Sequence, residues 1–471
     1  MGKPRVLVPL TIQFSVRYLL RTGLLAQLTA EAQPVVLLAW KDPSLRAEME
    51  QLGIEVHELP ETRYGPEYVA VRRQIDTWHF ERLASPTTAI ARRRENIGLS
   101  RRIRLLKQAR ELRNRLQLKL PGYAQRLLAR ERALLATDTN IAEFKTLVRS
   151  LRADGLLSLT PFHRQEELVV RAAADERLKM CAAILSFDNV TVRGWIGATF
   201  DAYLLWNRHN AEQLRRGYPD AASRRIEVVG APQFDFYWKP ELCWDEPSWR
   251  ERMKLPAERP VILYGGGPPS IVPHEPHIVM QLDAAIERGE VPGRPVILLR
   301  RHPADTSERW SGVLRDAKHV VFDEPWPSGE VPKYSNIRDA DIAKLVSSLK
   351  HSVVHVNVAS TMTVDGAVFD RPQIGPAYDD RPGRPFDRGM RELYAHEHFV
   401  PITRSGGLDI VRDRTALVAA VRAALENPAE RALGRKQLVR EIITFTDGQS
   451  TGRVLAALRS VFAGAAAAIA K

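Results

Sequence analysis

The sequence predicts an α/β protein built from two doubly wound domains, each with a parallel sheet, and a basic helical insertion in the first. Apolar strand patterns alternate with helix patterns along most of the chain, which is typical of parallel sheets. The chain has 471 residues, too many for one compact domain. An irregular, proline-containing run at 238–260 separates two such series, so we expect it to be a linker.

The first domain is expected over residues 1–235. Its sequence opens with a βαβαβ order, in which strands at 5–10, 34–40 and 54–59 alternate with helices at 17–30 and 43–52. The alternation resumes further on with helices at 141–151, 166–175 and 209–216 and strands at 155–159, 180–185, 202–206 and 225–229. Such an order predicts a doubly wound sheet.

A basic insertion over about 67–135 interrupts this rhythm. It is expected to form long helices broken at Pro121-Gly122. The net charge of the chain is +13, and the densest basic part runs from Arg92 to Arg132. This balance predicts an acidic partner, which could be nucleic acid, anionic lipid or a phosphorylated substrate. The plain alternative is a solvated pair of helices.

The second domain is expected over 236–450. Its strands are predicted at 261–264, 295–299, 319–322, 352–356 and 373–374, and its last helices at 415–425 and 429–443. Only two cysteines are present, Cys181 and Cys243, so neither a disulfide framework nor a zinc site is expected. With no signal-peptide pattern and no long apolar run, the expectation is a soluble, cytoplasmic protein.

Two strand ends in the second domain carry side chains suited to phosphate. An apolar strand ends in Arg300, Arg301 and His302. A guanidinium group matches the geometry of phosphate oxygens, and an imidazole donates a hydrogen bond to a leaving phosphate. The plain alternative is a surface turn with incidental basic residues.

The apolar run of the strand predicted at 352–356 continues to Ala359, ends in hydroxyls and opens a helix. Ser360 and Thr361 stand at the predicted helix start, where free N–H groups bind phosphate. Asp365 lies one helical turn after Thr361, so it could hold a ribose. Helix capping alone would explain the hydroxyls, and an interaction with the helix dipole would explain Asp365.

A glycine triplet, Gly265, Gly266 and Gly267, follows the strand at 261–264. Glycines let backbone N–H groups approach a phosphate or base closely. The triplet matches neither the dinucleotide fingerprint nor the P-loop. A tight turn without a ligand is the alternative.

Two residues in the first domain are candidates for proton transfer. His163 and Asp188 each follow a predicted strand. Either could take a proton from an acceptor hydroxyl as a general base. A structural histidine and an ordinary Asp-Asn turn are the alternatives.

These elements resemble GT-B glycosyltransferases, whose two Rossmann-like domains face each other across a cleft. The branch they resemble most acts on bacterial surface glycans and includes CDP-glycerol glycerophosphotransferases and CMP-sugar transferases. The likeness rests on the Arg-Arg-His-Pro run and the paired hydroxyls above, and on further segments at 186–189, 194, 201–207, 365–367, 370–374 and 445–453. It covers most of the chain outside the insertion.

The sequence departs from that family at three places. Phe187 stands where tryptophan is expected, and Asp365 where many such enzymes have glutamate. Val358-Ala359 precedes the hydroxyl pair instead of the Asp-Tyr of glycerophosphotransferases. These departures argue against a standard teichoic acid polymerase and leave the donor open.

The resemblance implies a transferase that needs no cofactor or metal and uses a CMP, CDP or UDP-type sugar as its substrate. The donor would bind the second domain, and a glycan or lipid-linked acceptor the first. The last helix, 451–471, would pack back on the first domain. The basic stretch could then touch an anionic membrane surface at its cytoplasmic face.

Three other functions fit the sequence less well. A CDP-glycerol-type glycerophosphotransferase shares the motifs, and a sugar-nucleotide 2-epimerase shares the two-domain fold. A nucleic-acid-binding protein would explain the charge, but the basic stretch lacks interleaved aromatic residues and no nucleic-acid motif is present. We therefore expect no nucleic-acid partner.

Overall fold

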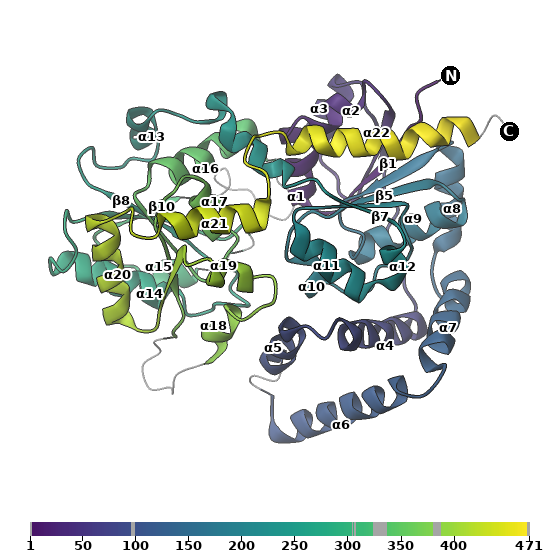
Figure 1. Cartoon of the computed structure of the whole chain (residues 1–471), viewed down its shortest axis with the longest axis horizontal. Helices are drawn as coiled ribbons and strands as arrows, with labels where there is room; N and C mark the ends of the chain where they lie inside the picture. Colours follow the sequence, from purple (N-terminus) through teal and green to yellow (C-terminus); the bar gives the residue numbers. More distant parts are fainter. Residues whose placement is uncertain are drawn as a thin grey trace. The chain divides into compact units, whose positions relative to one another are not determined.

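The computed structural model of the chain describes residues 2–95, 99–303, 305, 308–323, 337–379 and 388–468. It divides into two compact units, residues 1–233 with 449–471 and residues 234–448. Each unit contains one parallel sheet (Figure 1). Two doubly wound α/β units were predicted, and this fold class is confirmed.

Unit 1 is built on a seven-stranded sheet in the order β3-β2-β1-β4-β5-β6-β7. The strands are β1 (Arg5–Leu10), β2 (Gln33–Leu38), β3 (Glu55–Glu58), β4 (Gly155–Ser158), β5 (Lys179–Ala183), β6 (Ala202–Leu205) and β7 (Arg225–Val228). Strands β2 and β3 are added on one side of β1, and strands β4 to β7, which follow the insertion, are added on the other side. The order therefore reverses between β1 and β4, and ligands of such sheets bind outside the strand ends at this switch point.

Helices cover both faces of this sheet. They are α1 (Gln13–Val16), the π-helix η1 (Arg17–Arg21), α2 (Leu24–Leu28), α3 (Pro43–Gln51), α8 (Ile141–Ser150), α9 (Arg164–Asp175), α10 (Asn189–Val192), α11 (Arg208–Gly217), α12 (Pro219–Ala222) and α22 (Ser450–Ala468). Val454, Leu458 and Phe462 of α22 join the hydrophobic core on one face, together with side chains of β1 and β2. The end of the chain thus completes the core of unit 1.

The insertion forms four helices, α4 (Pro66–Leu83), α5 (Pro86–Glu95), α6 (Arg101–Leu118) and α7 (Tyr123–Thr137). The predicted break lies between α6 and α7, where Gly122 takes a φ of 70° that glycine adopts without strain. Buried ionic groups fix α4 to α9, since Arg72 lies 3.1 Å from Glu167 and the Tyr68 hydroxyl donates to Glu167 at 2.7 Å.

Unit 2 has a six-stranded sheet in the order β10-β9-β8-β11-β12-β13. Its strands are β8 (Val261–Gly265), β9 (Val296–Arg300), β10 (Val320–Asp323), β11 (Val354–Asn357), β12 (Gln373–Pro376) and β13 (Leu408–Val411). The order reverses between β8 and β11, so this pair marks the switch point. Tyr264, Leu299 and Val356 belong to the core on one face of the sheet.

The helices of unit 2 alternate with these strands. They are the 3₁₀ turns η2 (Pro232–Trp238, which begins just before the unit boundary) and η3 (Pro240–Leu242), and α13 (Glu246–Arg252), α14 (Pro276–Glu287), α15 (Arg309–Val313), α16 (Asp339–His351), α17 (Met362–Val368), α18 (Arg388–Leu393), α19 (Val400–Arg404), α20 (Arg414–Glu426) and α21 (Ala432–Ile443).

The structure differs from the sequence expectations in three elements. The helix expected at 17–30 is broken at Gly23, which has a φ of 80°. The run at 238–260, expected to be irregular, contains α13, which is capped by the Asp245 carboxylate. Strand β13 was not predicted, and it extends the sheet by pairing in parallel with β12.

Candidate functional site

The candidate donor site of unit 2 lies at the switch point of its sheet. Gly265 is the last residue of β8, and Asn357 is the last residue of the neighbouring β11, directly opposite Gly265 in the register. Arg300 ends β9 on the other side of β8 and is also in register with Gly265. Three segments predicted to touch the donor therefore begin side by side.

Close packing explains why Gly265 is a glycine. A Cβ at this position would lie 2.5 Å from the Met362 sulfur and 3.5 Å from the Asn357 Cβ. Such an approach is not possible without movement of Met362. The absent side chain thus lets the start of α17 pack directly against the end of β8.

The N–H groups of the next two glycines have partners within the unit, and the predicted approach of the triplet to a phosphate stays a prediction. The Gly266 N–H donates to the Arg300 carbonyl at 2.8 Å. The Gly267 N–H donates to the buried Glu275 carboxylate at 2.8 Å. These bonds join the glycine turn to β9 and α14, so the triplet shapes the floor of the site.

A cluster of charged residues holds the glycine turn in place. Arg309 donates to the Gly267 carbonyl at 2.9 Å, to the Val272 carbonyl at 2.6 Å and to Asp305 at 2.7 Å. The Trp310 indole also donates to Asp305, at 2.7 Å. The Asp305 N–H in turn bonds the His302 carbonyl. Arg309 therefore clamps the glycine turn and the His302 turn together.

Glu275 stands beside this clamp and is fully buried. Burial raises the pKa of its carboxyl to about 7, against the lowering effects of the Gly267 N–H and Arg309. The Arg309 guanidinium is 3.5 Å away, and the Tyr264 hydroxyl is 3.3 Å away. Glu275, Asp305 and Arg309 belong to none of the predicted motifs, although the four-residue spacing of Asp305 and Arg309 is typical of an ion pair on a helix.

Arg300 points toward the sheet edge. Its guanidinium pairs with the buried Asp323 of β10 at 2.5 Å, and Lys344 also lies 3.1 Å from Asp323. A phosphate-binding role for Arg300 stays a prediction and would have to share the guanidinium with this pair. Arg301 and His302, one and two residues beyond the strand, are both half-buried.

His302 is the predicted donor of a hydrogen bond to the leaving phosphate. Burial lowers the pKa of its imidazole, and the Arg309 charge lowers it further, while Asp305 acts in the opposite direction. The neutral imidazole is therefore favoured near neutral pH in the ligand-free protein. This form still carries one N–H donor.

The paired hydroxyls lie at the start of α17, as the sequence predicts. Ser360 Oγ accepts the Met362 N–H at 3.2 Å, and Asn357 Oδ1 accepts from the Ser360 N–H and from the Thr363 hydroxyl. Thr361 is exposed, and its side chain does not cap the helix. Ala359 has a φ of 43°, a strained value for alanine that turns the chain into this element.

Asp365 occupies the expected place one turn further along α17, but it is buried. Its carboxylate accepts a hydrogen bond from the Tyr237 hydroxyl. The predicted ribose contact remains a prediction and would compete with this bond. The neighbouring Gly366 is required by packing, since a Cβ there would lie 2.0 Å from His355.

The two candidate bases of unit 1 follow adjacent strands. His163 lies beyond β4 and precedes α9, and Asp188 lies beyond β5 and precedes α10. Because β4 and β5 are paired in parallel, both residues belong to the same sheet edge. Burial lowers the pKa of His163, with Arg193 contributing. The Asp188 side chain accepts from the Asn189 amide at 3.2 Å.

Glu166 lies at the switch point of unit 1 and was not singled out by sequence analysis. It is fully buried, and its carboxyl is surrounded by hydroxyls. Thr11 donates to it at 3.0 Å, Ser158 at 2.5 Å, and Thr160 also donates. Burial raises the pKa of Glu166, and the hydroxyl hydrogen bonds partly offset this.

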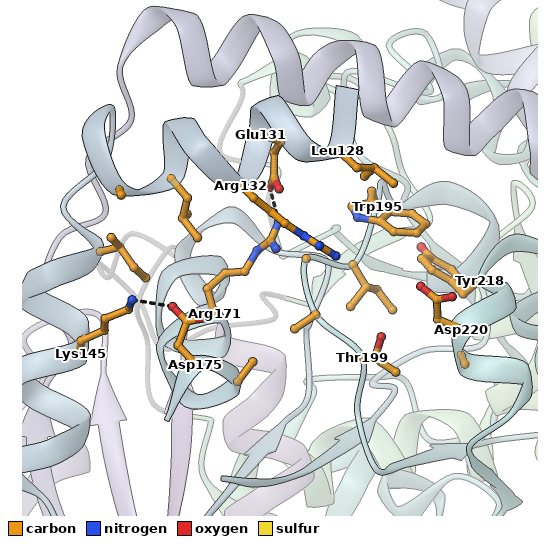
Figure 2. Close-up of a pocket in the computed structure, with 18 of the residues that line it drawn as sticks. Leu128, Glu131, Arg132, Lys145, Arg171, Asp175, Trp195, Thr199, Tyr218 and Asp220 are labelled. Carbon is orange, nitrogen blue, oxygen red and sulfur yellow. Dashed lines mark hydrogen bonds and ion pairs between the residues drawn. The ribbon is translucent and has the colours of Figure 1, made fainter. Parts of the chain in front are cut away.

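A cavity of about 500 Å³ lies elsewhere in unit 1 (Figure 2). Asp175, Thr199 and Ala221 of its wall lie three or four residues before the first residues of β5, β6 and β7, so the cavity lies toward the edge where these strands begin. Lys145 of the wall pairs with Asp175 at 2.6 Å, and Arg171 with Glu131. None of the predicted site residues lines it, so we assign it no step in the reaction.

Comparisons with known proteins identify the fold. No protein-family model matches the sequence, and no curated protein matches it. A solved structure described as a UDP-N-acetylglucosamine 2-epimerase from Listeria monocytogenes matches with a TM-score of 0.55 at 11% identity, over 98% of this chain and 97% of that one.

Two further solved structures match over nearly their full lengths. UDP-GlcNAc 2-epimerase from Neisseria meningitidis, bound to UDP-GlcNAc, has a TM-score of 0.55 at 10% identity, covering 96% of this chain and 99% of that one. A glycosyltransferase from Rickettsia africae has a TM-score of 0.51 at 10% identity, with 99% of each chain covered. The chain therefore has the GT-B type of fold that the sequence predicts.

Proposed function

We propose that this protein is a glycosyltransferase that moves a sugar from a nucleotide-activated donor to an acceptor hydroxyl in surface-glycan synthesis. One observation carries the proposal. The glycine turn after β8, the Arg300–His302 turn after β9 and the Ser360-Thr361 turn after β11 are adjacent at the switch point of unit 2, where sheets of this kind bind nucleotides.

The groups at this point suit a diphosphate that gains charge as the bond to the sugar breaks. Thr361 offers an exposed hydroxyl that its helix does not use, and His302 offers an imidazole N–H. Donors held in place before the reaction stabilise such charge without reorganisation. The Arg309 clamp fixes the turn that carries His302 to the glycine turn, so the His302 donor is held in place before the reaction.

The acceptor would bind unit 1. His163, whose lowered pKa favours the neutral imidazole, is in the form that accepts a proton near neutral pH. Asp188, on the same sheet edge, is the other candidate base. Either would take the proton of the attacking hydroxyl as the new glycosidic bond forms.

A sugar-nucleotide 2-epimerase is the second candidate, because two of the matching structures described above carry that name. Such an enzyme would use the same nucleotide site but no acceptor. The two candidates therefore differ in what happens to a nucleotide sugar supplied alone.

A thermal-shift screen against CMP, CDP, UDP, UMP, GDP and ADP tests the donor site. A nucleotide that binds only the folded state raises Tm. We expect a shift with one base, and a smaller shift in Thr361→Val. Thr415→Val is the matched control, since Thr415 is also an exposed threonine at the start of a unit 2 helix. No shift with any nucleotide would overturn the proposal.

The nucleotide sugar with the matching base then separates the two activities. Release of free nucleotide only when an acceptor glycan is present supports the transferase. Conversion of the sugar to its 2-epimer, with no acceptor and no net release of nucleotide, supports the epimerase instead.

A further inference from the structure

Helix α6 of the insertion has no residue buried in unit 1. It lies at the outer side of the insertion, beyond α4 and α7 (Figure 1). Its 18 residues make a rod of about 27 Å. Two ion pairs tether it, Lys107 with Glu95 at 2.9 Å and Arg115 with Glu81 at 3.0 Å.

The apolar face of α6 points away from the protein. Leu105, Ala109, Leu112 and Leu116 fall within an arc of about 60° on a helix. The three leucines are 66%, 58% and 57% exposed. We call Leu105, Leu112 and Leu116 the leucine stripe. A helix of a globular protein ordinarily buries such a stripe in the core.

The opposite face of α6 is turned toward the protein and is mainly polar. Lys107, Glu111, Asn114 and Leu118 are the half-buried residues on this side, at the spacing of one helix face. Only Leu118 of these packs against a hydrophobic cluster, that of Val71. The apolar face of α6 is therefore exposed and its polar face is turned toward the protein, which is the reverse of the usual arrangement.

Arginines flank the leucine stripe on both sides. Arg101 lies on one side, and Arg102 and Arg113 lie on the other. All three are exposed, and none forms an ion pair with a residue that the structure describes. The helix carries a single acidic residue, Glu111. An apolar stripe between basic flanks is the pattern of a helix that lies in the interface of an anionic bilayer.

We propose that α6 docks the protein on an anionic phospholipid surface, with the leucine stripe inserted among the acyl chains and its flanking arginines on the headgroups. The positive charge of the flanking arginines complements phospholipid phosphates. The leucine stripe supplies apolar area that the acyl chains can bury and that a phosphate group alone would leave in water. No helix in the described parts of the chain is suited to crossing a bilayer, so the contact would be peripheral.

Other occupants of α6 predict different behaviour. Nucleic acid would use the arginines but leave three leucines in water, and α6 has no aromatic residue on which bases could stack. A second copy of this chain would cover the leucines but bring the two sets of arginines together. The lipid surface alone satisfies both features.

Vesicle flotation of the full chain tests the proposal without any substrate, so its result is independent of the proposed transferase activity. We expect binding to phosphatidylcholine vesicles containing phosphatidylglycerol and weak binding to phosphatidylcholine alone. Leu105→Gln/Leu112→Gln/Leu116→Gln should lower partitioning at least tenfold. The matched control is Leu52→Gln/Met280→Gln/Leu433→Gln, which removes three exposed apolar side chains elsewhere and should bind as the wild type does.

Charge is tested separately. Arg101→Gln/Arg102→Gln/Arg113→Gln should weaken binding by about fivefold per charge and reduce its salt dependence. The control Arg412→Gln/Arg422→Gln/Arg440→Gln removes three exposed arginines of unit 2 and should change little. Equal binding by the leucine variant and the wild type would overturn the proposal. Tight binding of a DNA or RNA duplex, or dimerisation lost in the leucine variant, with no vesicle binding, would overturn it too.

Discussion

Both units place a buried glutamate beside the central strands of their sheets, but different groups contact the two carboxylates. In unit 1, Glu166 receives hydrogen bonds from the hydroxyls of Thr11, Ser158 and Thr160 and from the Thr160 backbone, which are all neutral groups. In unit 2, Glu275 receives a backbone N–H and lies 3.5 Å from the Arg309 guanidinium. Burial raises the pKa of both carboxyls.

The difference teaches how each strand edge is held. A hydroxyl both donates and accepts, so the cluster in unit 1 can adjust to a neutral or charged partner. A guanidinium only donates, so the cluster in unit 2 depends on its charges. The edge proposed to bind the donor is therefore locked by a cation, while the acceptor edge is held by neutral groups.

The largest expected effect comes from removing that cation. Arg309→Met should destabilise unit 2 by about 3–5 kcal/mol, because Asp305 and Glu275 would stay buried without it. The control Arg288→Met removes a surface ion pair of the same unit and should cost about 1 kcal/mol or less. Hydrogen exchange of peptides from β8 and α14 measures both. Equal losses of stability in Arg309→Met and Arg288→Met would contradict the conclusion that unit 2, unlike unit 1, depends on a buried cation.

The pH dependence of unit 2 gives the next effect. The Glu275 pKa, about 7 when folded, is above its ordinary value of 4.5. The folded state thus binds more protons in between, and this stability is fully present below pH 4.5 and lost as pH rises through about 7. The loss amounts to about 3 kcal/mol.

Glu275→Gln removes this titration and should flatten the dependence. Hydrogen exchange at pH 5 and pH 8 should show the variant gaining on the wild type at the higher pH, in unit 2 peptides only. If the gap between the two proteins does not widen with pH, the cluster in unit 2 is not governed by the Glu275 charge.

His302→Ala sharpens the functional side of the comparison. If His302 bonds the leaving phosphate, turnover should fall about 100-fold with little change in Tm, since one preorganised donor is lost. The control is His277→Ala, a half-buried histidine of α14. Initial rates of nucleotide release, with the donor identified by thermal shift, provide the measurement. Unchanged turnover would exclude the phosphate role.

The smallest effect is expected in unit 1. Glu166→Gln should cost only about 1 kcal/mol, because a hydroxyl can rotate to accept from the new amide. Glu166→Leu should cost more, since three buried hydroxyls would lose their acceptor. Denaturation, monitored by hydrogen exchange of peptides from β1 and β4, compares the stability of the two variants. A Gln variant as damaged as the Leu variant would show that the charge, and not the hydrogen bonding, holds this edge.

The sequence by itself determined the two parallel sheets and the strand ends at which polar residues gather. Strand and helix periods are local, so β1 was placed to the residue and Gly265, Arg300 and Ser360 to the correct sheet edge. The amphipathic arrangement of α6 is also written in its sequence.

Only the tertiary structure decided which polar groups meet. The partners of Glu275 and Asp365 are separated from them by many residues of sequence, as Tyr237 is from Asp365, and no local period records such pairs. The same holds for Gly266 and Gly267, whose N–H groups bond within the unit. The direction in which the leucine stripe faces is likewise set by the packing of α6 against its neighbours, because a helix has no preferred rotation until something covers one side of it.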